Sequence, residues 1–336
     1  MSQLLGLTLL SLFITGVLII PFIDFLYKAK LQRRSQKTVD PFNKRTLFFD
    51  KSSTWKIGTP FGGGILIIGV VVALFLWSIG LLNIEVSFWQ VFVLIFSFVG
   101  FGLLGLYDDL KKLGLGAKNV FFGLRLRHKF LLQWILALII GSILFFKLNY
   151  SFIFITGFGL VDLGIIFIFL AAFAIVSFAN AFNIADGLDG LASGLFVICM
   201  GAFLAISSTN LDKGLGAFVA ILMGSVLAFL YFNIYKARIW LGDVGSLSLG
   251  AILAVVGLLT GKIIALAVIG GFFVIEVGSS LLQLLSKKYL GKKIFPVAPF
   301  HLLLLKRGWE EPKIVMRAWL LGFFFGILGL FIAFMQ

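Results

Sequence analysis

The chain has 336 residues, of which 61% are hydrophobic and 12% are charged, with a mean hydropathy of +1.13 and a formal net charge of +14. No soluble globular core accounts for these values, so the composition excludes a soluble domain and indicates a polytopic membrane protein. The single cysteine, Cys199, can form no intrachain disulfide, and we interpret it as a packing residue inside an apolar run.

Runs of roughly 20 apolar residues predict ten transmembrane helices. The first run is interpreted as a retained span rather than a signal peptide, because its positive charges follow it. The ninth run, residues 263–285, is interrupted by Gly270, Gly271 and Gly278, which predicts a bend. We therefore expect an all-α fold in one integral-membrane domain covering residues 1–336. The approximate centres of the ten spans are Phe13, Val70, Phe96, Ala137, Ala171, Met200, Gly224, Val255, Phe273 and Gly326.

The positive charges give the orientation. The segments that follow spans one, three, seven and nine hold 25 of the 28 Lys and Arg residues, and the opposite segments hold only Lys147, Lys213 and Lys262. The positive-inside rule then places the basic segments in the cytoplasm and both termini outside. The net charge is mainly a topology signal that can also attract an anionic substrate or lipid, and we expect no nucleic-acid partner.

The segment before the second span combines start signals and glycines. Thr59 as N-cap and Pro60 at the first helical position predict where that helix begins. The three glycines at 62–64 allow two interpretations: tight helix packing, or an anion site at an open helix N-terminus beside Lys56.

Two adjacent acids, Asp108 and Asp109, end the third span. Adjacent carboxylates repel, so they need a cation, either the neighbouring Lys111 and Lys112 or a divalent metal such as Mg²⁺. Residues 149–159 predict an external loop or short hairpin. The intervening basic loop, in which we assign no catalytic role to His128, carries Lys118, Arg125, Arg127, His128 and Lys129.

The stretch 180–191 places two amides and two carboxylates between two apolar runs: Asn180, Asn183, Asp186 and Asp189. Asp186 and Asp189 are three residues apart and share one side of a helical turn, while Gly187 and Gly190 let a backbone or a phosphate come close. The simpler interpretation is a capped turn with Asn183 or Asp186 as N-cap.

The end of span seven carries Asn233, Trp240, Asp243 and Ser246. Asp243 is a lone acid just before the next span, where either it or Ser246 can serve as a helix cap. Trp240 is typical of an interfacial belt residue, but its flat ring can also stack on a nucleobase.

Two further polar residues lie in the last third. Glu276 lies within span nine, and we favour a structural role in which Ser279, Ser280 or Gln283 satisfies it. His301, one of only two histidines, is either a satisfied core residue or part of a site.

The predicted topology brings the polar residues together. Five of the 14 acids fall on the cytoplasmic side among 25 cations, as expected for binding Mg²⁺ and a polyanionic phosphate substrate. The residues on this face are Asp108, Asp109, Asn183, Asp186, Asp189, Asp243 and His301.

Six sequence blocks, in order, resemble the polyprenyl-phosphate N-acetylhexosamine-1-phosphate transferases, and within them the branch that transfers phospho-N-acetylmuramoyl-pentapeptide. The resemblance runs from about Lys56 to Arg317. Its blocks are Thr59-Pro-Phe-Gly-Gly-Gly, Asp108-Asp-Leu-Lys-Lys, residues 180–191, Phe232-Asn233 with residues 241–250, Gly291-Lys-Lys-Ile-Phe, and Ala298-Pro-Phe-His301 with Gly308-Trp-Glu-Glu-Pro-Lys.

The resemblance implies a cytoplasmic active-site cleft in the inner membrane of a bacterium, Mg²⁺, and commonly a homodimer. The implied reaction transfers a phospho-sugar from a UDP-sugar to undecaprenyl phosphate and releases UMP. By position, Asp243 would bind the metal with Asp108, Asp109 and Asn183 near it, and His301 would belong to the catalytic set. Asn233 and Trp240 would contact the uridine. The family usually has Phe at the position of Trp240. The remaining residues implied to line the cleft are Lys56, Thr59, Lys112, Lys129, Asp186, Asp189 and Gln283.

The sequence departs from the family at three places. A run of three histidines followed by Phe-Glu is here His301 followed by four leucines, Gly62 replaces a usual Met, and Ala185 replaces a usual Thr. A transferase that uses UDP-N-acetylglucosamine or another UDP-N-acetylhexosamine is therefore the alternative within the class. An ion-coupled transporter or lipid flippase is the alternative from another class, and it predicts neither UMP release nor a need for Mg²⁺.

Phosphoryl transfer depends mainly on in-line positioning and charge neutralisation. We therefore prefer direct attack of the lipid phosphate on the diphosphate, with Asp108 taking any residual proton. A covalent aspartyl intermediate is the other route.

Overall fold

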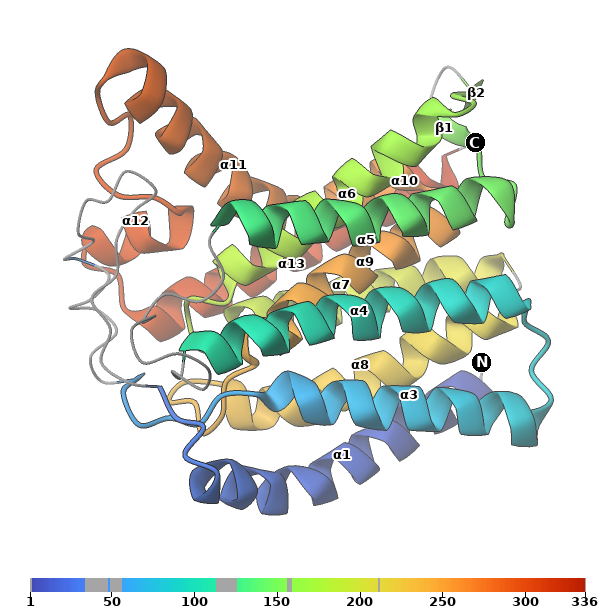
Figure 1. Ribbon diagram of the computed structural model, residues 1–336, viewed down its shortest axis with the longest axis horizontal. Coiled ribbons are helices and arrows are strands. Elements are labelled where there is room, and N and C mark those ends of the chain that lie inside the picture. The colour runs from blue at the N-terminus through green and yellow to red at the C-terminus, as the bar shows by residue number, and fades with distance from the viewer. Residues whose placement is uncertain are drawn as a thin grey trace.

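The computed structural model describes residues 2–33, 48, 56–112, 126–155, 159–210 and 212–335. Within these residues, nine helices are long and apolar enough to cross a membrane, and a bent helix pair makes a tenth span. The helices run side by side as a bundle, and both chain ends lie at the end that carries a short hairpin (Figure 1). The predicted all-α membrane fold with ten spans is confirmed. Lys118 and Arg125 of the predicted basic loop lie outside the described residues.

The helices and the two strands are arranged along the chain as follows. In chain order they are α1 (Ser2–Lys28), α3 (Gly63–Leu82), α4 (Phe88–Lys112), α5 (Leu126–Phe146), β1 (Phe152–Ile155), β2 (Gly159–Asp162), α6 (Ile166–Ala185), α7 (Leu191–Thr209), α8 (Lys213–Asn233), α9 (Gly242–Leu259), α10 (Ile263–Ile269), α11 (Gly271–Leu285), the π-helical turn η2 (Ser286–Leu290), α12 (Phe300–Lys306) and α13 (Glu311–Phe334). The two strands pair antiparallel, with Phe152 opposite Asp162, as the hairpin prediction requires.

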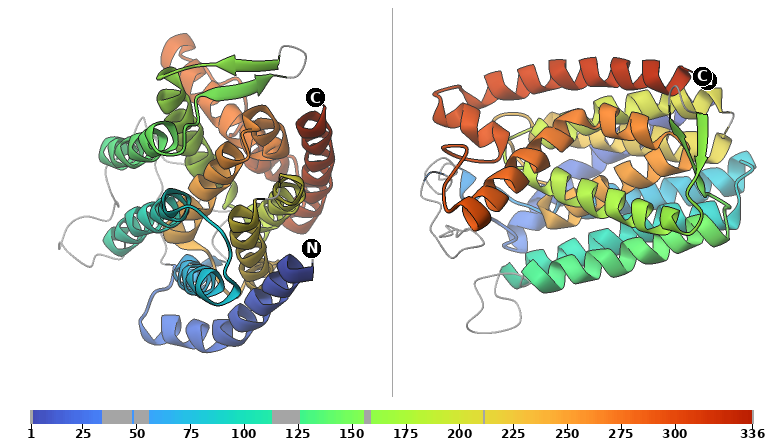
Figure 2. Two further views of the ribbon diagram at one scale, coloured as in Figure 1. Left: turned by 90° about the vertical axis from the view of Figure 1, so that its right-hand side faces the viewer. Right: turned by 90° about the horizontal axis from the view of Figure 1, so that it is seen from above.

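Helix α9 forms the centre of the bundle. All its residues from 244 to 259 are buried, and it packs against α3, α4 and α6. A helix that is apolar on every side has no face to offer water or a charged surface, so it is buried among other helices. The end-on view in Figure 2 shows α9 surrounded, with α1 and α13 at the periphery.

Glycines let the neighbours of α9 approach its backbone. A Cβ at Gly64 of α3 would lie 2.2 Å from the Cα of Gly245, and a Cβ at Gly105 of α4 would lie 2.1 Å from the carbonyl oxygen of Asp243. Small residues permit such contacts between membrane helices. The approach at Gly105 draws the acidic end of α4 against the start of α9.

The start of α3 differs from the prediction. The helix begins at Gly63, with Gly62 in the left-handed conformation at its cap and no capping side chain. Thr59 and Pro60 precede the helix, because Pro60 pairs with Gln32 in an isolated bridge. The prediction of a Thr59 cap was wrong, because this segment forms an extended backbone pairing with residue Gln32, which lies far away in the sequence.

Backbone bonds to the segment just before α9 overturn the anion-site interpretation of the glycines. The amides of Gly62 and Gly63 donate to the carbonyl oxygen of Trp240, and the amide of Gly64 donates to that of Leu241. These donors are therefore already used by backbone acceptors. The tight-packing interpretation is the one that holds.

The ninth span is broken as predicted. Helices α10 and α11 meet at Gly270, and the axis turns by 78° between residues 263–269 and 271–290. A Cβ at Gly270 would lie 2.4 Å from the Phe178 ring, so only glycine fits at this corner. Gly278 lies inside α11 and causes no break. The turn sends α11 outward from the bundle toward η2 and α12 (Figure 1).

Candidate functional site

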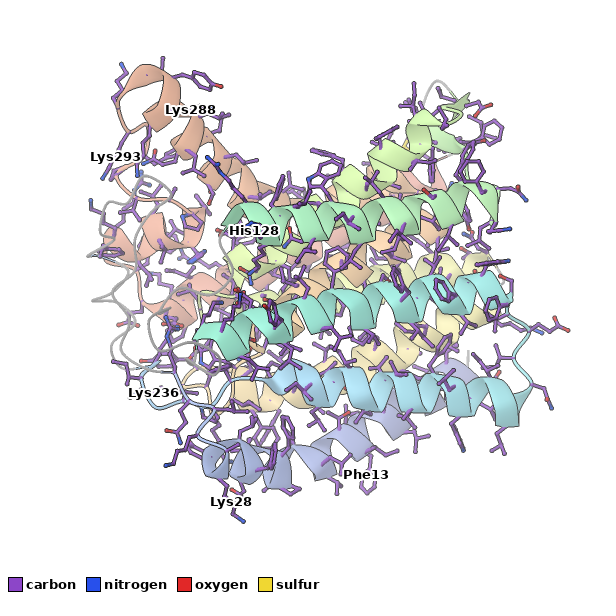
Figure 3. The ribbon with its side chains drawn as sticks, in the orientation of Figure 1. Phe13, Lys28, His128, Lys236, Lys288 and Lys293 are labelled. Carbon is purple, nitrogen blue, oxygen red and sulfur yellow. The ribbon has the colours of Figure 1, made fainter. Side chains whose placement is uncertain are left out.

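The polar residues singled out in the sequence gather at the end of the bundle opposite the two termini. The labelled basic residues Lys28, Lys236, Lys288 and Lys293 lie at this same end (Figure 3). The C-terminal end of α4, the turn between α6 and α7, the start of α9 and the short helix α12 all meet there (Figure 1).

A cluster of carboxylates and lysines joins α4, α5 and α9. Lys112 Nζ lies 3.1 Å from Asp108 Oδ2 and 2.9 Å from Asp243 Oδ2. Lys129 Nζ lies 3.0 Å from Asp108 Oδ2 and also pairs with Asp243 Oδ2. Asp108 and Asp243 therefore share both lysines, although the four residues come from three helices. We call these four residues the acid–lysine cluster.

Asp109 performs a different task from its neighbour. Its Oδ2 accepts the backbone N–H of Val244 at 3.1 Å, and its Oδ1 lies 3.8 Å from Lys112 Nζ. The first N–H groups of a helix lack partners within the helix, and Leu241, at the cap of α9, supplies no side-chain acceptor. Asp109 supplies one from α4, so the alternative interpretation, in which Asp243 or Ser246 caps α9, does not hold.

The turn between α6 and α7 is held by contacts from several elements. Glu311 Oε1 accepts the amide of Asp189 at 2.7 Å, and Lys56 Nζ donates to the carbonyl of Gly187 at 3.1 Å. Asn233 Oδ1 accepts the amide of Gly190 at 3.2 Å, and Trp319 Nε1 donates to the carbonyl of Gly190 at 3.1 Å. These bonds fix the backbone of residues 187–190.

The simpler interpretation of this stretch, a turn capped by Asn183 or Asp186, does not hold. Asp186 ends α6, with its amide bonded to the carbonyl of Phe182 at 2.9 Å, and Gly190 in the left-handed conformation precedes α7. Neither Asn183 nor Asp186 caps α7. A residue with positive φ is required at that corner, and Gly190 meets the requirement without strain.

Lys56 is a buried ion-pair partner. Its Nζ lies 2.7 Å from Glu311 Oε1 and 3.3 Å from Asp189 Oδ1, and 4.5 Å from the centroid of the Trp240 ring. Asp189 Oδ2 also accepts the amide of Ala237 at 2.9 Å. Lys56, Asp189 and Glu311 thus tie the segment before α3 to the α6–α7 turn and to the start of α13.

Trp240 is buried beneath cations. Its side chain is only 9% exposed, so it is not a residue of an interfacial belt. The guanidinium carbon of Arg33 lies 5.5 Å from the ring centroid, in addition to the contact with Lys56. A cation over an aromatic face is attracted by the ring quadrupole. Thr59 lies beside this region, with its carbonyl accepting the amide of Arg33 at 3.0 Å.

Three predicted site residues are held in place by hydrogen bonds to other protein groups. Asn233 accepts from Ser193 Oγ at 2.7 Å and donates to the carbonyl of Ile239 at 3.0 Å, in addition to its bond at the α6–α7 turn. Asn183 Nδ2 donates to Ser246 Oγ of α9 at 2.7 Å. Gln283 bonds to the backbone of residues 294 and 295 through both its oxygen and its nitrogen.

His301 and Glu276 form a buried pair. The distance from His301 Nδ1 to Glu276 Oε2 is 2.9 Å, and Glu276 Oε1 accepts the backbone N–H of His301 at 3.1 Å. Glu276 is satisfied by protein groups, as expected, but its partner is His301 rather than Ser279, Ser280 or Gln283. The Nε2 side of the ring faces Gly187, where a Cβ would lie 2.7 Å from Nε2.

The electrostatics outside the membrane spans reflect this crowding. Burial raises the pKa of Asp186 well above its usual range, and the negative charge of Asp243 adds to the shift. Burial lowers the pKa of Arg33, while Asp186 and Asp189 oppose that change. Both groups therefore lie within electrostatic reach of the site.

The carboxylate oxygens of the acid–lysine cluster are suitable ligands for a divalent cation. Carboxylate oxygens are the ligands that Mg²⁺ prefers, and Asp108 and Asp243 already converge on the same positive groups. Among the described residues, no set of three His, Cys, Asp or Glu side chains forms a ready metal site. A metal ion at this position would therefore replace an ammonium group between the two carboxylates.

Sequence reasoning missed two contributors. Glu311 holds both Lys56 and the turn, and Arg33 lies over Trp240. Glu311 falls within the Gly308-Trp-Glu-Glu-Pro block, which is the one signal that could have identified it. Nothing distinguishes Arg33 from its basic neighbours in the sequence.

Comparisons with known proteins identify the family of this chain. The profile of glycosyl transferase family 4 matches residues 90–261. A protein of Rickettsia canadensis (strain McKiel) called phospho-N-acetylmuramoyl-pentapeptide-transferase is 36% identical, over 96% of this chain and 90% of its own length. Proteins of the same name from Rickettsia felis and Bacillus licheniformis are 37% and 35% identical, over 96% and 99% of this chain and over 90% and 98% of their own lengths.

The fold and the site define a multi-pass membrane protein with a buried polar centre at one end of its helix bundle. The chain belongs to glycosyl transferase family 4, whose profile spans α4 to α9, the helices that carry the acid–lysine cluster. The resemblance inferred from six sequence blocks is confirmed.

Proposed function

We propose that this protein transfers phospho-N-acetylmuramoyl-pentapeptide from its UDP conjugate to undecaprenyl phosphate, with release of UMP. The product is the first lipid-linked intermediate of peptidoglycan synthesis. The observation that carries the proposal is the match, over 96–99% of the chain, to relatives that bear the name of this activity.

The acid–lysine cluster supports the chemistry. An oxygen of the lipid phosphate attacks the phosphorus bonded to the sugar, and the bond from that phosphorus to UMP breaks. Lys112 and Lys129 neutralise charge on the phosphates, and Asp108 accepts any proton remaining on the lipid phosphate. Such positioning and charge compensation supply most of the catalysis in phosphoryl transfer.

Mg²⁺ is part of the proposal. Asp243 and Asp108 would hold it. Asn183 lies close by, because its Nδ2 donates to Ser246 Oγ, which is about one helical turn after Asp243 in α9. When bound, the ion would neutralise charge on the diphosphate. On the basis of the family resemblance, we also propose a homodimer in a bacterial inner membrane, with the site facing the cytoplasm.

A reconstituted assay tests the function. Purified protein in detergent receives undecaprenyl phosphate, Mg²⁺ and either UDP-N-acetylmuramoyl-pentapeptide or UDP-N-acetylglucosamine, and UMP is measured. We expect UMP only with the muramoyl-pentapeptide donor and only with Mg²⁺. Equal release from both donors would contradict the assigned sugar, and no release from either would contradict the activity.

Isotope exchange tests the single-step route. The reaction replaces one phosphoanhydride with another, so labelled UMP should enter the UDP-sugar pool when the lipid product is present. A covalent phospho-sugar intermediate would allow the same exchange without any polyprenyl carrier. Exchange in rigorously lipid-free protein would therefore overturn direct attack.

A further inference from the structure

Glu276 is an acid with no exposed surface, located in a helix whose neighbouring residues Val274 and Ile275 face outward. A carboxylate at that depth in a membrane protein is costly without partners. Its two oxygens bond to a single residue, His301, through the ring Nδ1 and the backbone amide.

Helix α12 begins on groups supplied by α11. Pro299, at the cap of α12, offers no side-chain acceptor, so the first amides need acceptors from elsewhere. Ser279 Oγ accepts the amide of Phe300 at 3.0 Å, and Glu276 accepts the amide of His301. One turn of α11 therefore fixes both the backbone and the side chain of His301.

The hydrogen-bond pattern selects a protonation state for the ring. An ionised carboxylate only accepts hydrogen bonds, and it faces two groups here, the His301 amide and Nδ1. The pattern is complete when Nδ1 carries the proton. In the neutral ring Nε2 is then the acceptor, directed toward Gly187 and the turn that bears Asp186 and Asp189.

We propose that Glu276 is a positioning residue for the transferase reaction: it fixes His301 with the proton on Nδ1 and with Nε2 directed at the α6–α7 turn. The role in turnover rests on the proposed function, whereas the ring geometry does not. When a carboxylate accepts a hydrogen bond from one ring nitrogen of a histidine, it leaves the other nitrogen as the one available to the site.

The chain allows a direct test because it has only two histidines. His128 is exposed at the start of α5, so His128→Gln leaves His301 as the single ring in ¹⁵N-histidine-labelled protein. Nitrogen NMR at pH 9, above the ordinary imidazole pKa, should show a protonated Nδ1. A bare Nδ1 in this otherwise unaltered site would overturn the proposal.

Substitution of Glu276 tests the consequence. In Glu276→Gln, the amide oxygen can take the backbone N–H while the NH₂ group donates to Nδ1, so the ring proton should move to Nε2. We expect kcat to fall by about ten- to a hundredfold with KM little changed, as for other residues that orient a functional histidine. A kcat within twofold of wild type would overturn the positioning role.

Ser279→Ala provides the matched control. It removes the neighbouring support of α12 and leaves the Glu276–His301 pair, so Nδ1 should stay protonated and kcat should stay near wild type. If Ser279→Ala lowers kcat as much as Glu276→Gln does, general disorder of α12 explains the loss and the proposal fails. Because NMR needs no substrate, a protonated Nδ1 in a protein without transferase activity would refute the proposed function alone.

Discussion

Asp243 and Asp108 share two ammonium groups that come from α4 and α5. Both lysines of Asp243 come from other helices, whereas Asp108 pairs with Lys112 of its own helix and with Lys129 of α5, so neither lysine belongs to one acid alone. An arrangement of this kind stabilises charge and also holds it at a fixed position, which a phosphate reaction requires.

Asp243→Asn should abolish turnover, because an amide cannot replace a charged ligand or balance two lysines. We expect UMP release to fall at least about tenfold, a barrier increase of about 1.4 kcal/mol or more. Asp24→Asn at an exposed position of α1 makes the same chemical change away from the site and should have no effect. Retention of more than about a tenth of the activity would remove Asp243 from the proposed metal site.

Asp186 predicts a pH dependence of stability. Its pKa is raised in the folded protein, first by burial, so the folded state binds more protons than the unfolded state between the ordinary carboxyl pKa and the raised value. The contribution of Asp186 is thus favourable in acid and is lost as pH rises through this window.

Asp186→Asn removes the titrating carboxyl and with it this pH dependence. The unfolding temperature of the wild type, measured relative to the variant, should fall as pH increases above about 4, the ordinary carboxyl value. Comparing the two proteins at each pH cancels the other titrating groups. A difference that stays constant across the pH range would show that Asp186 titrates normally.

At the scale of the elements, the position of α9 depends on direct backbone-to-backbone contacts with α3 and α4. Gly64 and Gly105 bring α3 and α4 onto its backbone at the level of Asp243. A small displacement of α9 would therefore move Asp243 relative to its lysines.

Gly64→Ala should lower the unfolding temperature and the turnover rate together. The added methyl would lie 2.2 Å from the Cα of Gly245, and overpacking of this kind costs about 1–3 kcal/mol. Gly69→Ala, in the same helix, meets nothing within 4 Å and serves as the control. Equal stability of the two variants would mean that α3 and α9 do not pack as described.

At the scale of the whole molecule, the two ends of the bundle differ in charge. The labelled basic residues lie at one end and both termini lie at the other, as the distribution of Lys and Arg predicts (Figures 1 and 3). The acid–lysine cluster lies at the basic end, so the orientation of the bundle decides which compartment supplies the substrate.

Cysteine labelling tests the proposed orientation. In a Cys199→Ser background, a cysteine that replaces exposed Lys147 should react with an impermeant maleimide in intact cells. A cysteine that replaces exposed Lys236 should react only after permeabilisation. The opposite pattern would place the site outside the cell.

The spans, a bend in the ninth of them and the convergence of the acids at one end could all be predicted from the sequence. These features follow from local quantities: the length of apolar runs relative to a bilayer, the charge asymmetry between loops, and glycines that interrupt a span. The acids at the ends of α4, α6 and the start of α9 could be assigned to one face for the same reason.

Which groups pair depends on contacts between segments that are far apart in the sequence. Lys56 and Glu311 are 255 residues apart, and no local pattern links them. The predicted caps failed because acceptors came from other segments: Asp109 serves α9, and the carbonyl of Trp240 serves the start of α3. The sequence predicts partners for Glu276 on its own helix, whereas its partner in the structure, His301, lies on α12, which follows the turn at Gly270.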